Sequence, residues 1–476
     1  MNPTPVPFSA LFTRQNGSTL REKVCAMLRE AMASATLPAG TRLPSSRLLA
    51  SDLSLSRVTI EAAYSQLESE GYLSRKSGRG TFVAISPSVS QNRHRPASAA
   101  PQLSARGGQM VAGGGCDDPL FPHAFAAGSP DLRAFPQPLW RRLTQQRLRS
   151  DSTSLMQYGD PLGLPDLRQA VAHYLAQSRG VRCSADQVMI LTSSQQALQI
   201  IALLLCDAGD PVGMEDPGYP GAWHAFRYAG AQLTSIATDE QGAVPPEGPA
   251  PRLVYLTPAH QYPTGVTMSG QRRLTWLAWA RRHQSWLIED DYDSEFHYDG
   301  RPLPALQGLE DRARVLYLGT FSKVLFPSLR LAYLVVPDAL IEPLRRLRSV
   351  MDGHSAQLMQ AVTADFIQHG HFAAHLRLMR QLYASRRQRL IEELNEKLAD
   401  RLTLLSHQGG LQLTVHLTSG GEQRLTQQAA QNGLLLPRLS PLYQQQPAQE
   451  GWLLGFSALQ PAEIVQAVLK LSRLSY

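Results

Sequence analysis

The most distinctive chemical group in this chain is Lys323, in the loop of the segment LGTFSKVLFPSLRLAYLV. A lysine that forms an imine with an aldehyde cofactor must be partly desolvated, so that its amine is free to react. Thr320, Ser322 and Arg330 lie close to it in sequence, and hydroxyl donors and a forked guanidinium suit a dianionic phosphate. The pattern indicates a lysine that holds a phosphorylated aldehyde; the alternative is an ordinary surface lysine.

A second group of chemically active side chains lies in WLIEDDYDSEF, where an apolar strand ends in acids. Asp290 and Tyr292 are two residues apart, so they share one face if the strand continues. A pyridine ring needs a carboxylate at its nitrogen to stay protonated, and a phenol can hydrogen-bond a hydroxyl group on that ring. A magnesium site and a solvated turn are the alternatives for this acid cluster.

Three turns add further candidates. In LTSSQQALQI, Ser194 and Gln195 lie where a strand turns into a helix, and backbone N–H groups at a helix N-terminus bind phosphate. In EDPGYPGAW, Tyr219 can stack on a flat ring, and TPAHQYPTG is a Pro-rich turn after a strand. The alternatives are that the serines form a plain N-cap and that the tyrosine is only packed.

The elements that must position these residues alternate between short apolar runs and helical segments from about residue 119 onward. Strand-like runs occupy residues 188–191, 253–256, 286–288, 315–318 and 331–336. This alternation is typical of an α/β fold with a mostly parallel sheet covered on both faces. Residues from about 372 to 476 predict a smaller α+β C-terminal subdomain, with a long amphipathic helix over 376–398.

The first 83 residues have a different character. They hold ten Lys and Arg residues against six Asp and Glu, which is +4 of the chain's +7. Helical spacing predicts three helices, over 19–34, from about Pro44 and from an N-cap at Ser56, followed by two short strands around RKSGRG. This is the order of a winged helix, and the charge is that of a nucleic-acid-binding domain.

In a winged helix, the first residues of the recognition helix enter the major groove. The candidates for DNA contact in that helix, the preceding helix and the wing are Arg47, Ser56, Arg57, Thr59, Ser77 and Gly78. Arg57 can reach a phosphate or a guanine edge, and Thr59 a phosphate or a thymine methyl group. The alternative is a small helical domain whose basic residues are only solvated.

A chain of 476 residues is long enough for two or three domains. Residues 84–118 are dominated by Ser, Pro, Ala, Gly and Gln, and predict a flexible linker between a domain at 1–83 and one at 119–476. No long apolar run or secretory signal is present, and four cysteines without paired spacing fit a reducing cytosol. We therefore expect a cytoplasmic protein with no metal centre and no membrane partner.

The stretch LPAGTRLPSSRLLASDLSLSRVTIEAAYSQLESEGYLSRKSGRGTFV resembles the GntR-type winged helix over its whole length. The match consists of a Pro-x-Gly-x-x-Leu-Pro-Ser-x-Arg entry, a Ser-Arg start of the recognition helix, and a Glu-Gly-Tyr-Leu exit into a Gly-containing wing. The resemblance implies that DNA is contacted by Arg47, Arg57, Thr59 and Gly78.

The phosphate turn, the tyrosine turn, the Pro-Thr-Gly turn, Asp-x-Tyr and the Ser-Lys loop occur in an order that resembles fold-type I aminotransferases, across roughly residues 119–476. Together with the head, the whole chain resembles the MocR subfamily of GntR regulators. The resemblance implies pyridoxal phosphate as cofactor, with an aldimine on Lys323, Asp290 at the pyridine nitrogen and Tyr292 at the 3-hydroxyl. It implies Tyr219 as the ring stacker. The phosphate would be held by Ser194, Gln195, Ser322 and Arg330.

Three further positions bear on the resemblance. Tyr158, in MQYGDPLGLPDLR, matches the family, and in a head-to-tail homodimer it would reach the phosphate of a neighbouring subunit's cofactor. Tyr262 stands where ordinary aminotransferases have Asn before Pro-Thr-Gly, and the regulators share this departure. Aminotransferases place an arginine near the last strand to hold a substrate carboxylate; EGWLLGF has none there, and Arg438 is the nearest candidate upstream.

The sequence therefore predicts a transcription regulator that depends on pyridoxal phosphate and senses an amine, an amino acid or pyridoxal phosphate itself through Lys323. Its expected partners are a double-stranded DNA operator with two half-sites and a second copy of the chain, and the DNA-bound form would be nucleoid-associated. One alternative is an active aminotransferase with a DNA-binding head, in which Lys323 is catalytic. Another is a binding module whose large domain has lost the cofactor.

Overall fold

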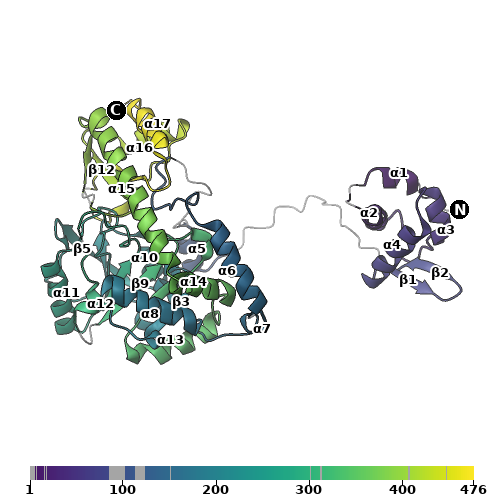
Figure 1. Ribbon diagram of the computed structural model, residues 1–476, viewed down its shortest axis with the longest axis horizontal. Helices are drawn as coiled ribbons and strands as arrows, with labels where there is room; N and C mark the ends of the chain where they lie inside the picture. Colours follow the sequence, from purple (N-terminus) through teal and green to yellow (C-terminus); the bar gives the residue numbers. More distant parts are fainter. Residues whose placement is uncertain are drawn as a thin grey trace. The chain divides into compact units, whose positions relative to one another are not determined.

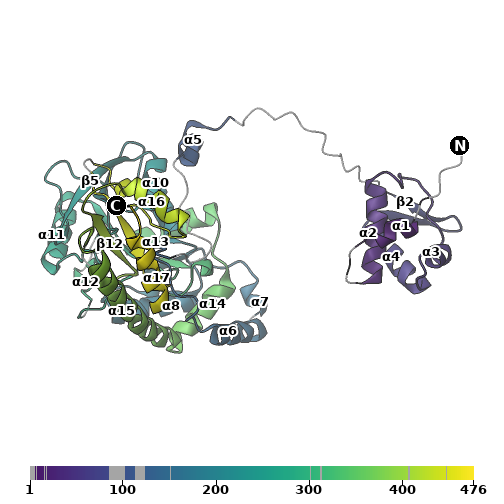
Figure 2. The same ribbon diagram turned by 90° about the horizontal axis from the view of Figure 1, so that it is seen from above.

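The computed structural model describes residues 6, 8–15, 17, 19–84, 102–112, 124–150, 152–300, 302–310, 314–405, 408–445 and 448–475. The chain divides into two compact units, Met1–Gln102 and Leu103–Tyr476 (Figures 1 and 2). The second unit contains a helix, α5 (Ala105–Ala112), within the segment predicted as a linker. Of that segment, residues 85–101 and 113–118 lie outside the described residues. No helix in the described parts of the chain is long and apolar enough to cross a membrane.

The first unit is a winged helix, as predicted. Its elements are α1 (Phe8–Thr13), α2 (Leu20–Ala33), α3 (Ser46–Asp52), α4 (Arg57–Ser69), β1 (Leu73–Lys76) and β2 (Gly80–Val83). Side-chain oxygens of Thr19, Ser45 and Ser56 accept from backbone N–H groups at the starts of α2, α3 and α4. These caps explain why the helices begin where the sequence analysis expects them.

One apolar core holds this unit together. Val24 and Leu28 from α2 pack with Ile60 and Leu67 from α4, all without solvent exposure. Apolar residues spaced three or four apart put these side chains on the facing sides of the two helices. β1 and β2 pair as an antiparallel hairpin, and Gly78 in its turn has a φ of +70°, which glycine adopts without strain.

The second unit is built on an eight-stranded sheet. Its strands are β3 (Val188–Leu191), β4 (Pro211–Asp216), β5 (Gln232–Asp239), β6 (Gly242–Ala243), β7 (Leu253–Leu256), β8 (Trp286–Asp291), β9 (Val315–Thr320) and β10 (Ala332–Val335). The order is β3-β10-β9-β8-β7-β4-β5-β6. The run β9-β8-β7-β4-β5 is parallel, and β10 is antiparallel to both of its neighbours. The predicted mostly parallel sheet is confirmed.

Helices cover both faces of this sheet, so its central strands are apolar on both sides. One face packs against α9 (Ser194–Leu205), α10 (Pro220–Ala229) and α13 (Asp338–Met351). The other face packs against α6 (Gln137–Ser150), α8 (Pro165–Arg179), α11 (Gly270–His283), α12 (Leu306–Leu309) and α14 (Gln357–Gln368). The short helix α7 (Ser152–Leu155) follows α6.

The C-terminal part forms a smaller α+β subdomain (Figure 1). A three-stranded antiparallel sheet is formed by β11 (Leu402–Leu404), β12 (Gln412–Leu417) and β13 (Gly451–Gly455). The helices are α15 (His371–Leu398), α16 (Glu422–Gln431) and α17 (Pro461–Ser472). The long helix predicted over 376–398 is α15, which begins five residues earlier than the periodicity indicates.

Candidate cofactor site and DNA-binding surface

The sheet topology brings the predicted cofactor residues to one edge. Parallel strands present their carboxyl ends at the same edge of a sheet, where ligands of open α/β folds bind. Ser194 follows β3, Tyr219 follows β4, and Lys323 follows β9. β10 runs antiparallel between β3 and β9, so Arg330, which precedes β10, lies at that edge as well.

Lys323 lies in a tight turn directly after β9. Within that turn, the backbone N–H of Ser322 donates to the hydroxyl of Thr320 over 3.1 Å. Gly128 packs against the lysine amine, because a methyl group at Gly128 would lie 3.0 Å from Nζ. Lys323 is half-buried, so it is neither an exposed surface lysine nor sealed in the core.

Asp290 is a buried carboxyl group at the end of β8, and 4% of it is exposed. One oxygen, Oδ2, accepts from the Tyr255 hydroxyl at 2.7 Å, whereas Oδ1 has no hydrogen-bond partner in the described structure. Burial raises the pKa of Asp290 to about 7, and the charges of Asp291 and Asp293 act in the same direction. A buried acceptor without a partner is costly, and a cationic N–H placed against Oδ1 would remove that cost.

Aromatic rings line this part of the edge. The ring of Tyr262 lies edge-on to that of Tyr219 at 5.6 Å and to that of Tyr292 at 6.2 Å between centroids. The Tyr292 hydroxyl donates to the His260 carbonyl at 3.0 Å. β8 ends at Asp291, so Tyr292 begins the loop and is not a continuation of the strand.

The phosphate turn lies at the start of α9. Ser193 caps the helix by accepting from the N–H of Gln196, and Ser194 is the first helical residue. Gln195 is held by a hydrogen bond from its Nε2 to the Gly221 carbonyl at 3.0 Å. Its Oε1 is buried and has no partner among the described residues. The free N–H groups of the first turn are therefore available to an anion.

No described contact joins Tyr158 or Arg438 to the predicted cofactor residues at this edge of the sheet. Tyr158 is 99% exposed, and its ring contact is with His354 at 6.1 Å. Arg438 is exposed, and its backbone pairs with that of Trp452 in the small subdomain. Arg330 is exposed and adopts a φ of +54°, an unusual conformation for a residue other than glycine.

The other acids beside Asp290 have protein partners. Asp291 accepts from Arg179 at 2.7 Å, and Asp293 contacts the His260 ring at 2.7 Å. Glu289 accepts from the backbone N–H groups of the first two residues of α12. In the described parts of the chain, no group of three or more His, Cys, Asp or Glu residues is placed to hold a metal ion. Glu289, Asp291 and Asp293 are therefore held by groups of the protein itself.

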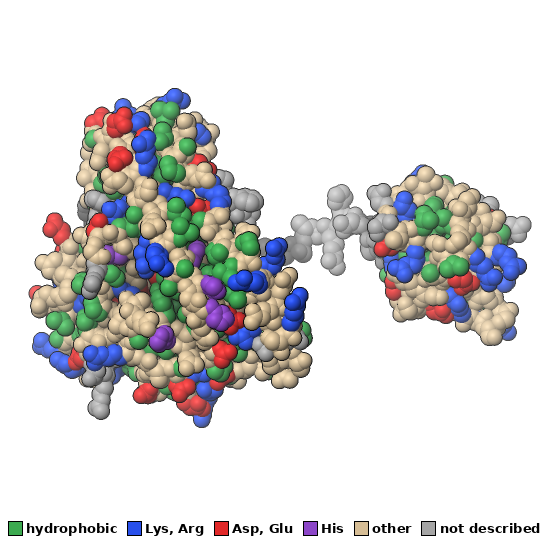
Figure 3. All heavy atoms as spheres, viewed as in Figure 1, with side chains coloured by type: hydrophobic (Ala, Val, Ile, Leu, Met, Phe, Trp, Pro, Cys, Tyr) green, Lys and Arg blue, Asp and Glu red, His purple; other side chains and the backbone are tan. Residues whose placement is uncertain are grey.

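The predicted DNA-contacting residues lie on the winged-helix unit. Arg57 opens α4 and is exposed, while the Ser56 and Thr59 hydroxyls lie 2.8 Å apart at the cap of that helix. Arg47 is exposed on α3, and Ser77 and Gly78 are exposed at the tip of the wing. Figure 3 shows several groups of Lys and Arg side chains on one face of this unit.

One basic residue of the wing forms ion pairs with the recognition helix. Arg75, on β1, contacts Glu68 at 3.0 Å and Glu61 at 3.4 Å on α4. β1 runs back along the end of the recognition helix α4, and this brings the guanidinium of Arg75 to the carboxylate of Glu68. Arg75 therefore fixes the wing to α4.

Comparisons with known proteins agree with both halves of the structure. Residues 20–83 match bacterial regulatory proteins of the gntR family, and residues 125–454 match aminotransferase class I and II. The chain is 40% identical to the probable rhizopine catabolism regulatory protein MocR of Rhizobium meliloti, over 93% of this chain and 90% of that protein. The chain belongs to the MocR-type GntR regulators.

Two further likenesses extend this result. The HTH-type transcriptional regulator TauR of Rhodobacter capsulatus is 31% identical, over 85% of each chain. The structure of Pyrococcus horikoshii kynurenine aminotransferase in complex with PMP has a TM-score of 0.69 and 26% identity, and covers 78% of this chain and 94% of that one. This member of the MocR-type regulators thus combines a GntR winged helix with the fold-type I aminotransferase fold.

Sequence reasoning missed several residues of this MocR-type site. Tyr255 lies in the middle of β7, and no motif marks it as the partner of Asp290. Glu215, on β4, is fully buried and accepts the Thr257 hydroxyl; burial raises its pKa to about 7. Gln261 donates to the carbonyl of Pro217 at 2.8 Å. A buried acid at the end of an apolar strand, as in VGMED, is the signal that could have identified Glu215.

Proposed function

We propose that this protein is a DNA-binding transcription regulator that holds pyridoxal phosphate at the carboxyl edge of the large sheet and uses Lys323 to sense an amine, an amino acid or pyridoxal phosphate itself. The observation that carries the proposal is the buried Asp290 carboxyl group with one oxygen unpartnered in the described structure, at the same edge as Lys323. Family membership supports the regulatory role.

The residues present fit the cofactor. Oδ1 of Asp290 and Oε1 of Gln195 are buried acceptors that lack partners among the described residues. A protonated pyridine nitrogen supplies the donor that Asp290 lacks, and such a carboxylate keeps the ring an electron sink. When bound, pyridoxal phosphate supplies an aldehyde that reacts with primary amines.

Each side chain then has a stated role. Lys323 provides the amine, Tyr292 a hydroxyl beside the ring's 3-oxygen, and Tyr219 a flat surface for stacking. Phosphate would be bound by Ser194, Gln195, Ser322 and Arg330, through helix N–H groups, hydroxyls and a guanidinium. Arg438 is proposed to meet an effector carboxylate.

The proposed domain division is a winged-helix domain at 1–83, a linker at 84–118 and a cofactor domain at 119–476, with a small subdomain from about 372. DNA contact is assigned to Arg47, Ser56, Arg57, Thr59, Ser77 and Gly78. Two heads in a head-to-tail homodimer would bind two operator half-sites, and Tyr158, which is almost fully exposed, would reach a partner's cofactor phosphate. A DNA-binding regulator of this kind acts in the cytoplasm, at the nucleoid.

The first test is the visible absorption spectrum of the full-length protein with added pyridoxal phosphate, followed by borohydride reduction and mass spectrometry. We expect a yellow band and a cofactor mass fixed to Lys323. Lys323→Ala should lose both, and the matched control Lys470→Ala, on the exposed side of α17, should keep both. A wild-type protein without the band would overturn the cofactor proposal.

The second test separates base and phosphate contacts from the structural role of the wing. Arg57→Ala should weaken operator binding by about tenfold to 100-fold, because one contact to a base or phosphate is worth about 1–3 kcal/mol. Lys76→Ala should produce a smaller loss. Arg75→Ala, which breaks the contacts to α4, should lower the melting temperature of the head as well as operator binding.

An active aminotransferase with a DNA-binding head is the second candidate, favoured by the likeness of the large unit to kynurenine aminotransferase. It predicts steady turnover of an amino donor with an oxo acid. The regulator proposal predicts that amines shift the absorption band and change operator affinity without sustained turnover. Measuring oxo-acid formation and operator binding in the same samples distinguishes the two.

A further inference from the structure

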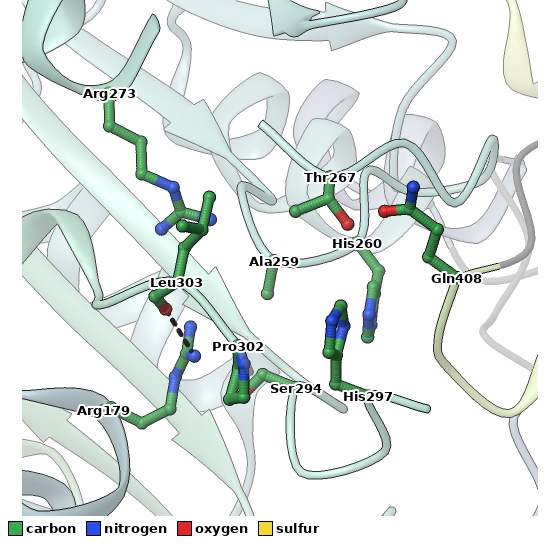
Figure 4. Close-up of a pocket in the computed structure, with 10 residues that line it drawn as sticks. All are labelled: Arg179, Ala259, His260, Thr267, Arg273, Ser294, His297, Pro302, Leu303 and Gln408. Atoms are coloured by element: carbon green, nitrogen blue, oxygen red, sulfur yellow. Dashed lines mark hydrogen bonds between the residues drawn. The ribbon is translucent and has the colours of Figure 1, made fainter. Parts of the chain in front are cut away.

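A polar cavity lies beside β8, away from Asp290. Its volume is about 190 Å³, and its walls come from the ends of α8 and α11 and from the loops after β7 and β8. In Figure 4, Arg179 and Arg273 lie on one side of it, and the rings of His260 and His297 on the other. One water molecule takes up about 30 Å³ of liquid, so the space suits an ion of several heavy atoms.

This cavity lies on one face of β8, and the side chain of Asp290 points to the other face. Side chains alternate along a strand, so Glu289 and Asp291 point to one face and Asp290 to the other. Arg179 binds Asp291 at 2.7 Å, and Arg273 lies 3.8 Å from Glu289. Both arginines line the cavity, whereas the hydroxyl bonded to Asp290 is that of Tyr255 in the core on the other face.

Two polar atoms of the cavity walls lack partners in the described structure. Arg179 is 5% exposed; its Nε and Nη1 are used by Asp291 and the Leu303 carbonyl, but the buried Nη2 has no acceptor. The hydroxyl of Thr267 is buried and unpaired as well. A buried donor without an acceptor destabilises the fold, so both atoms favour a ligand that accepts hydrogen bonds.

The groups on the cavity wall determine which kind of ligand fits. Two guanidinium groups line the cavity, and each lies beside a buried carboxylate: Arg179 binds Asp291, and Arg273 lies 3.8 Å from Glu289. The three nitrogens of Arg273 donate to backbone carbonyls, so Nη2 of Arg179 is the guanidinium donor left for a ligand. His260 holds Asp293, so that acid is already occupied on the far wall. Both unpartnered atoms can donate, so the fitting ligand accepts from a guanidinium N–H and from a hydroxyl, and the two oxygens of an oxyanion do this.

We propose that this cavity is an effector site for a small oxyanion, a carboxylate or a phosphate, bound by Arg179 and Thr267 on the face of β8 opposite the cofactor edge. The site does not depend on the cofactor assignment. Because its main cation also holds Asp291, the residue next to Asp290, occupancy changes the electrostatic potential on both faces of the strand.

The test is calorimetric titration of the full-length protein with malonate and, separately, with inorganic phosphate, at constant ionic strength. We expect saturable binding of at least one of the two anions, and the difference between them identifies the source of the oxyanion. Malonamide, which has the size of malonate without its charge, should not bind. Equal binding of malonamide would overturn the anion assignment.

Variants locate the binding. Thr267→Val replaces an unbonded buried hydroxyl by a methyl group, so it should not lower the melting temperature of the ligand-free protein, while weakening anion binding by about tenfold or more. Thr267→Ser keeps the hydroxyl and should keep binding. Ala259→Leu, on the cavity wall, should exclude the anion by filling the space.

Lys323→Ala tests the other location. Binding that Lys323→Ala removes and Thr267→Val leaves intact would assign the anion to the cofactor edge and overturn the proposal. Binding of neither anion would also overturn it, because water alone would then satisfy Arg179.

Discussion

Asp290 and Asp291 are neighbours on one strand with opposite environments. Each is 4% exposed, and each accepts a tyrosine hydroxyl, from Tyr255 at 2.7 Å and from Tyr317 at 2.6 Å. Each also leaves its Oδ1 without a hydrogen-bond partner in the described structure. Asp291 has the Arg179 guanidinium at 2.7 Å, whereas no cation in the described structure acts on the pKa of Asp290. The pKa values diverge accordingly: burial raises that of Asp290 to about 7, while Arg179, against the effect of burial, holds that of Asp291 below its ordinary value.

This difference indicates that Asp291 has a structural role and that Asp290 is available to a ligand. A buried carboxylate that has a guanidinium partner stabilises the fold only as long as the pair is intact. A buried carboxyl group without a cation lowers the stability of the fold, and strongly perturbed acids of this kind cluster at functional sites. Because the two residues are adjacent in sequence, only the alternation of the strand assigns them to different faces.

The largest expected effect comes from removing Arg179, the cation that pairs with Asp291. Arg179→Met should lower the free energy of unfolding of the large unit by about 3–5 kcal/mol, because it leaves a buried charge unpaired. Urea unfolding followed by tryptophan fluorescence measures this. Arg282→Met, on the exposed side of α11, is the matched control and should change the value by no more than about 0.5 kcal/mol. A small loss for Arg179→Met would mean that the two acids do not differ as described.

The second prediction concerns the pH dependence of Asp290. An acid with a raised pKa binds more protons in the folded than in the unfolded state between about pH 4 and pH 7. Its contribution to stability is therefore present below pH 4, and is lost as pH rises to about 7. In the protein without cofactor, Asp290→Asn should be less pH-sensitive than the wild type over this window.

The comparison with Asp290→Asn is needed because other buried acids titrate in the same window. Burial also raises the pKa of Glu215 and of Glu295 to about 7. Both residues remain in the variant, so the difference between the two unfolding curves reports Asp290 together with its effect on the pKa of Glu215, which the charge of Asp290 helps to raise. Parallel curves for the wild type and Asp290→Asn would show that Asp290 is ionised in the folded protein.

How far the sequence predicts this site depends on whether a feature is local. The winged helix follows from caps such as Ser56 and from helical spacing, and Asp290 and Lys323 each follow from one short motif in the sequence. The roles of Tyr255 and Arg179 do not, because β7 and α8 are brought to β8 only by the order of the sheet. The ion pairs of Arg75 with Glu61 and Glu68 do not follow from the sequence either, since these partners lie on another element.

The smallest expected effect comes from removing the tyrosine hydroxyl that donates to each acid, Tyr255 for Asp290 and Tyr317 for Asp291. Tyr317→Phe should cost about 1 kcal/mol at pH 5 and at pH 8 alike, because Arg179 keeps Asp291 ionised at both. Tyr255→Phe removes the hydrogen bond that lowers the pKa of Asp290, so that pKa should rise further and the loss of stability should extend to higher pH. Urea unfolding at the two pH values measures both variants. If Tyr255→Phe and Tyr317→Phe show the same pH dependence, Asp290 is not the unpaired acid of the pair.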